Sequence, residues 1–154
     1  MPPTQSYVAM KMPLVALLLA SLVGVEVFGA EEPDNRTPLE RYQGDGEFSL
    51  LMCKISLRMA LDRAALGEQQ DEKSDVAGCI EKGKATTKKS LELALRTVRK
   101  AKAKEALKSY HVSFVGALEG IRPGSDERKI SYEQRQQTLK GKLTEAWARF
   151  EVEQ

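Results

Sequence analysis

The chain has 154 residues, of which 30% are charged and 6% aromatic, and its formal net charge is +2. This length makes one domain the starting expectation, and a mean hydropathy of -0.40 favours a soluble chain over one embedded in a membrane. The counts of two cysteines and one histidine exclude a cysteine-rich scaffold and leave too few ligands for a zinc site. Helix-forming residues dominate the last two thirds, so we expect an all-α fold.

The first 30 residues predict a cleavable secretory signal peptide. Residues 13–25 (PLVALLLASLVGV) are apolar without interruption, follow Lys11 and end at Glu26. The run is too short for a membrane-spanning helix, which needs roughly 20 residues, although an uncleaved anchor is the alternative. Export then places the mature chain in a periplasm or outside the cell, and the compact signal favours a bacterial periplasm. We expect translation to start at Met1 or Met10 and cleavage to follow Gly29 or Ala30.

Export makes a disulfide between Cys53 and Cys79 the expected state, with two buried free thiols as the alternative. A loop of this length stabilises the fold by roughly 3.5 kcal/mol in the chain-entropy model. The two cysteines are equidistant from Leu66, so an antiparallel hairpin that turns there would bring them level. If residues 68–74 formed the whole turn, the cysteines would be offset by about 12 Å, too far for a bond. The disulfide therefore predicts that residues 68–74 fold asymmetrically or partly as helix.

Residues 31–46 contain two prolines, two glycines and several acids, which predicts a flexible amino-terminal arm before a helical domain at 47–154. The first helix is expected at 47–66 and to end at Gly67. Its apolar residues recur every three to four positions, and three further leucines widen the stripe. We expect so wide a stripe to contact more than one neighbouring helix. The stripe comprises Phe48, Leu51, Met52, Ile55, Met59 and Leu66, and the widening residues are Leu50, Leu57 and Leu61.

Residues 75–118 favour helix without an obvious breaker, and we expect one long central helix there. Rotation of the apolar stripe leaves open two helices that meet between Ala101 and Ala106. A turn at 120–125 precedes a last helix that begins at Ser125 or Asp126 and runs to about Val152. The expected architecture is an antiparallel bundle of three helices, or four if the central helix breaks. The last helix should pack through Tyr132, Gln136, Leu139, Leu143, Ala146 and Phe150.

The charge is distributed unevenly along the chain. Residues 31–80 contain 6 basic and 11 acidic residues, a net of -5, whereas residues 81–108 contain 10 basic and 3 acidic residues, a net of +7. A basic segment of this kind binds an anionic surface or partner, or forms a solvated helical face. Nucleic acid is the less favoured partner because no aromatic residue is interleaved. The basic residues are Lys82, Lys84, Lys88, Lys89, Arg96, Arg99, Lys100, Lys102, Lys104 and Lys108.

No motif in the sequence indicates catalysis, a cofactor or a metal. The single histidine, His111, has no nucleophile or glycine-rich elbow at a spacing that implies a triad, so we expect a structural or surface role. Four aromatic residues are candidates for a docking patch, although core packing is the ordinary role of such residues. They are Tyr110, Phe114, Trp147 and Phe150.

These observations predict an exported, non-enzymatic helical protein that binds a partner. One alternative is a ligand or cofactor carrier with a pocket between helices near Met52, Met59 and Tyr110. Another is a basic envelope-associated protein that binds anionic surfaces. We expect no stable transmembrane anchor, and the sequence leaves the oligomeric state open.

Overall fold

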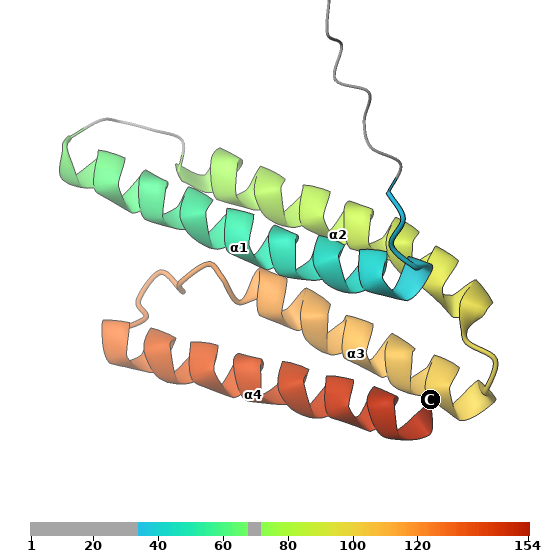
Figure 1. Cartoon of the computed structure of the whole chain (residues 1–154). Helices are drawn as coiled ribbons and strands as arrows, with labels where there is room; N and C mark the ends of the chain where they lie inside the picture. Colours follow the sequence, from blue (N-terminus) through green and yellow to red (C-terminus); the bar gives the residue numbers. More distant parts are fainter. Residues whose placement is uncertain (1–33, 68–71) are drawn as a thin grey trace, which may run out of the picture. The chain divides into compact units, whose positions relative to one another are not determined.

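The structure, a computed structural model, describes residues 34–67 and 72–154, so the expected signal peptide lies outside the described residues. The regular elements in this part of the chain are four α-helices: α1 (Pro38–Ala65), α2 (Glu72–Thr97), α3 (Ala101–Glu119) and α4 (Lys129–Glu153). α1 and α2 form one antiparallel hairpin, α3 and α4 form a second, and α3 contacts both helices of the first (Figure 1). The expected all-α class is confirmed.

The favoured count of three helices is wrong, because residues 98–100 break the expected central helix into α2 and α3. An unbroken helix over 75–118 would be about 65 Å long, and its second half would extend away from α1. The break lets α3 fold back against α1 and α2. Val98 lies buried in the turn, and the Thr97 hydroxyl donates a hydrogen bond to Ala94 O (2.8 Å).

α1 begins at Pro38, nine residues before the expected start, so the expected irregular arm at 31–46 is largely helix where it is described. The reason is a capping box. The Thr37 hydroxyl accepts a hydrogen bond from Glu40 N–H, while the Glu40 carboxylate accepts one from Thr37 N–H (2.7 Å). Pro38 at the start of the helix strengthens this signal, since its missing N–H would have no helical partner there.

The α1–α2 hairpin has a covalent bond and small residues at its interface. Cys53 and Cys79 form a disulfide with Cα atoms 5.5 Å apart, and α2 begins at Glu72, so the predicted partly helical connection is confirmed. Gly67 ends α1 with a φ of 78°, a conformation that favours glycine. A Cβ atom on Gly83 would lie 3.1 Å from Ser49 Cβ, so the two backbones approach closely at this point.

The α3–α4 hairpin has large aromatic residues at its interface. The Tyr110 and Trp147 rings are 4.9 Å apart between centroids and meet edge to face, and Trp147 also contacts the fully buried Phe150. Phe114 is buried between the hairpins, and Tyr42 of α1 meets Tyr110 edge to face at 6.0 Å. The aromatic side chains of the second hairpin therefore form the centre of the core.

α4 begins at Lys129, after Ser125 and Asp126 rather than at them, because Glu127 forms other interactions. Glu127 accepts a hydrogen bond from Gly124 N–H (3.0 Å) and two from the Arg135 guanidinium (2.8 and 2.6 Å). Arg135 also donates to the backbone carbonyls of Gly120 and Arg122. Arg135 thus joins α4 to the turn that precedes it, and the pKa of Glu127 is lowered to about 2, chiefly by the hydrogen bonds from Arg135.

Candidate functional site

The outer face of α1 carries most of the exposed large apolar side chains of the described residues. Seven of the eleven lie on α1 or at its carboxyl end. Six of these fall on one side of the helix, and we call them the α1 stripe. The α1 stripe consists of Phe48, Leu51, Met52, Ile55, Met59 and Leu66.

The geometry of α1 explains why the stripe points outward. Cys53 is bonded to α2 and is completely buried. Because successive residues are separated by about 100° around a helix, Ile55 lies about 200° from Cys53. Gly46 contacts the Phe114 ring of α3, and Ile55, nine residues later, lies about 180° from Gly46. The face that points away from both partners is therefore the apolar one.

This orientation corrects the expectation that the stripe packs against neighbouring helices of the same chain. The buried residues of α1 are instead mostly small or polar, and only Leu50 and Leu57 of the expected stripe are half-buried against the core. The inward face contains Tyr42, Gly46, Ser49, Cys53 and Ala60.

Each side chain of the stripe is exposed over a large fraction of its surface. Phe48 is 64% exposed, Met59 47% and Leu66 79%. Taking about 200 Å² for a fully exposed large side chain, the stripe exposes roughly 600 Å² of apolar surface, at the upper end of the largest patch on a typical monomer. Isolated exposed apolar residues need no explanation, but a patch of this size is a candidate interaction surface.

Charges of both signs border the stripe. Arg58 and Asp62 lie 4.0 Å apart and are both highly exposed. Lys54 and Glu47 are exposed on the same helix. A border of mixed sign suits a protein partner better than an anionic bilayer, which would favour basic residues alone.

The four aromatic residues proposed for docking lie largely inside the molecule. Tyr110, Phe114 and Phe150 are buried in the core, so a partner cannot reach them in this conformation. Trp147 is partly buried, and its ring N–H donates a hydrogen bond to the Glu151 carboxylate (2.7 Å). The burial of Tyr110 raises its pKa to about 12.

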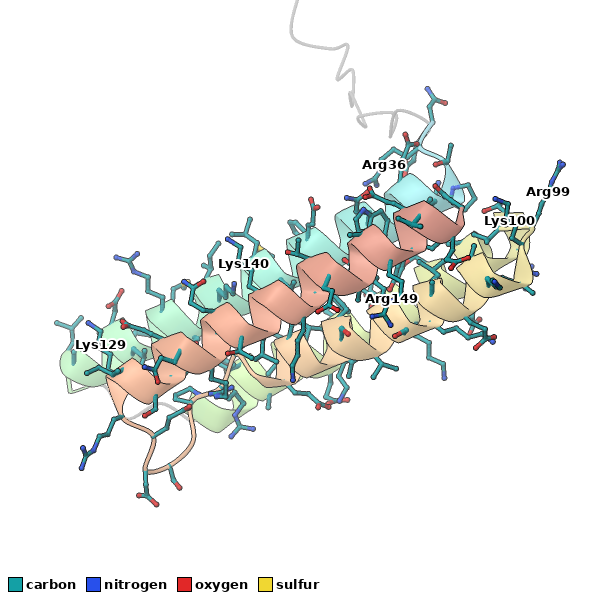
Figure 2. All side chains as sticks on the ribbon, turned by 90° about the horizontal axis from the view of Figure 1, so that it is seen from below. Arg36, Arg99, Lys100, Lys129, Lys140 and Arg149 are labelled. Carbon is teal, nitrogen blue, oxygen red and sulfur yellow. A yellow bond between two sulfur atoms is a disulfide. The ribbon has the colours of Figure 1, made fainter. Side chains whose placement is uncertain are left out.

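The ten basic residues lie on α2, on α3 and in the turn between them. Lys84 bridges Glu81 and Glu119, each at 2.9 Å, which raises the pKa of its ammonium, and Lys108 pairs with Glu105 at 2.8 Å. Arg99 and Lys100 project at the α2–α3 turn, at the opposite end of the helices from Lys129 (Figure 2). The structure thus spreads these residues over two helices and one end of the bundle, and does not gather them on a single flat face.

His111 has a structural role. Its Nδ1 and the Tyr42 hydroxyl share a hydrogen bond of 3.1 Å, and its ring stacks on Phe114. Partial burial, assisted by the nearby Lys88 ammonium, lowers the pKa of His111. The neutral imidazole therefore ties α3 to α1 inside the aromatic cluster.

The three residues expected to line a pocket between helices do not lie around one cavity. Met52 and Met59 are exposed on α1, whereas Tyr110 is buried, so these residues do not line one cavity. A hollow of about 490 Å³ lies on α3 and α4, where alanines and charged residues that include Lys102, Glu105 and Arg149 line it. Within residues 34–67 and 72–154, no three potential metal ligands converge. None of the described helices has the length and apolar content needed to span a bilayer.

The chain matches no protein-family model, no curated protein and no solved structure. The sequence does identify the residues of the α1 stripe, but assigns them to the core. The position of Cys53 could have shown which way these residues point. Because Cys53 must face α2 to form its bond, Ile55, two positions later, points away from α2.

Proposed function

We propose that this chain is an exported, non-enzymatic binding protein whose contact surface is the α1 stripe. The observation that carries the proposal is the exposure of six large apolar side chains on one face of α1. A helix of a monomer that serves the fold alone places such residues inward. α1 reverses this arrangement, and exposing roughly 600 Å² of apolar surface to water is unfavourable unless a partner covers it.

The disulfide supports the same proposal in two ways. It fixes the rotation of α1 relative to α2, so the stripe is presented in one orientation before any partner arrives. A preorganised surface loses less conformational entropy on binding than a mobile one. The disulfide also persists in an oxidising compartment, which agrees with export through the leader at residues 1–30.

A photo-reactive amino acid tests the surface in living cells. Placed at Ile55, it should give a cross-linked adduct upon irradiation. Placed at Val112, an apolar residue of α3 that is 72% exposed, it should give none. Equal labelling at both positions, or none at Ile55, would contradict the proposal. Fractionation of the same cells and determination of the amino terminus test export.

A second candidate function is attachment to an anionic envelope component through the α2–α3 turn. The observation that favours it is the concentration of Arg96, Arg99, Lys100 and Lys102 around that turn, two of which are seen at the end of the bundle in Figure 2. Such attachment is electrostatic and should weaken steeply as salt rises, because exposed charges are screened. A contact through the α1 stripe should persist at the same salt concentration.

A further inference from the structure

We propose that the partner of the α1 stripe is a second copy of this chain, which packs its own α1 antiparallel against the first about a two-fold axis. This inference rests on the proposed function, since it names the occupant of the same surface. Two observations carry it: the spacing of the apolar residues and the area of the patch.

The spacing of four residues of the stripe is the same in both directions along the helix. Phe48, Met52, Ile55 and Met59 are separated by four, three and four residues. Two antiparallel helices related by a two-fold axis need such a reversible spacing, because each residue must meet its symmetry-related position. In this register Met52 meets Ile55 of the second copy, and Phe48 meets Met59.

The two-fold axis then lies level with the disulfide. The midpoint between Met52 and Ile55 falls beside Cys53, and Cys53 is bonded to Cys79 of α2. The bond to α2 therefore fixes the rotation of α1 at the centre of the proposed contact.

The apolar area of the stripe is large enough to form a stable dimer interface. The four central residues and Leu51 expose roughly 500 Å² per chain, so pairing would remove about 1,000 Å² of apolar surface from water, the minimum for a specific interface. An anionic bilayer is a poorer occupant, because α1 contains four acidic and four basic residues and has no net positive charge to attract it.

Sedimentation velocity of the purified protein, expressed from the full-length sequence, tests the dimer. The expected mass at micromolar concentration is twice that of one chain, whose amino terminus is defined by mass spectrometry. Ile55→Glu and Met52→Lys should each raise the dissociation constant about thirty-fold or more, the loss typical of a central interface residue. The matched control Val112→Lys introduces a charge at an exposed apolar residue off the stripe and should leave the dimer intact.

Mixing Met52→Lys with Ile55→Glu tests the register. In a mixed dimer the lysine introduced into one chain meets the glutamate introduced into the other, while the second pair remains Ile55 with Met52. The mixture should therefore regain dimer that neither variant forms alone, and high salt should weaken it. Circular dichroism of each variant establishes that it is folded.

Each outcome bears on a different level of the proposal. A wild-type protein that stays monomeric up to about 100 µM, well above the range of specific complexes, overturns the self-association. If Ile55 then cross-links to another protein in cells, the proposed function stands without this inference. If it cross-links to nothing, both fail. Variants that dimerise like the wild type overturn the assignment to the stripe, and a mixture that stays monomeric overturns the antiparallel register.

Discussion

The two hairpins of this molecule use their large side chains in opposite ways. In the α3–α4 hairpin the aromatic residues Tyr110, Phe114 and Phe150 point inward and are buried. In the α1–α2 hairpin small residues such as Gly83 and Ser49 lie at the interface, and large apolar residues of α1 point outward. The second hairpin is stabilised by burial of aromatic surface, whereas the first depends on a covalent bond.

This difference shows what the disulfide permits. A helix pair with few large residues between its helices gains little from burial, and a disulfide offsets that deficit. The large residues of α1 then remain available for contact with another molecule. We infer that the first hairpin is built for presentation of a surface and the second for stability of the fold.

The largest expected effect is the difference in stability between variants of two phenylalanines, one in each hairpin. Phe114→Ala should destabilise the protein by about 3–5 kcal/mol, because Phe114 is 1% exposed and its removal leaves a cavity in the core. Phe48→Ala, in the α1 stripe, should change the free energy of unfolding by less than about 0.5 kcal/mol in dilute solution. Urea unfolding of both variants measures the contrast. Equal losses would mean that the stripe packs within its own chain, and would remove the basis of the comparison.

The second effect concerns the covalent bond. Cys53→Ala with Cys79→Ala should cost roughly 3.5 kcal/mol, since the bond closes a loop of 26 residues. Hydrogen exchange should show lost protection first in α1 and α2, while the amides of α3 and α4 stay protected until global unfolding. Uniform loss of protection across all four helices would contradict the different roles of the two hairpins.

The third effect tests the ionic link that takes the place of a disulfide in the second hairpin. Arg135→Met should cost about 1–2 kcal/mol, because it removes hydrogen bonds to the carbonyls of Gly120 and Arg122. Thermal unfolding monitored by circular dichroism provides the measurement. Gln136→Leu is the matched control, since Gln136 donates to the same Gly120 carbonyl but pairs with no carboxylate.

The same link gives the second hairpin a dependence on pH. The pKa of Glu127 is about 2 in the folded protein against an ordinary value of 4.5. A lowered carboxyl pKa contributes stability that is complete above about 4.5 and is lost as the pH falls towards 2. The difference in melting temperature between the wild type and Glu127→Gln should therefore shrink over this range. A constant difference would show that the ionised carboxylate contributes nothing there.

How much of the fold the sequence predicts depends on the kind of signal. Helix content, the disulfide and the stop at Gly67 follow from composition, compartment and backbone chemistry. The early start of α1 is also readable, since Thr37 and Glu40 form a capping box around Pro38. The break at residues 98–100 is readable only in part. Rotation of the apolar stripe indicates a break near Ala101, but neither glycine nor proline marks its position.

The candidate site shows a deeper limit of sequence reasoning. Apolar periodicity identifies the residues of the α1 stripe, but periodicity cannot distinguish a face that packs within the chain from one that packs on another molecule. Small residues such as Gly46 and Ser49 form the true inward face, and hydropathy does not reveal them. The position of Cys53 supplies the missing orientation once its bond to α2 is considered.

The smallest expected effect concerns helix capping at the amino-terminal ends of α1 and α4. α1 begins with the Thr37 capping box, whereas Arg128 at the start of α4 makes no side-chain capping hydrogen bond and places a positive charge at the positive end of the helix dipole. Arg128→Ser should therefore stabilise the protein by about 0.5–1 kcal/mol, and Thr37→Ala should destabilise it by a similar amount. Chemical denaturation of the two variants and the wild type measures both changes. A loss of stability in Arg128→Ser would show that Arg128 contributes a contact of its own. The gain that we expect would instead show that the amino-terminal end of α4, unlike that of α1, is not optimised by a capping side chain.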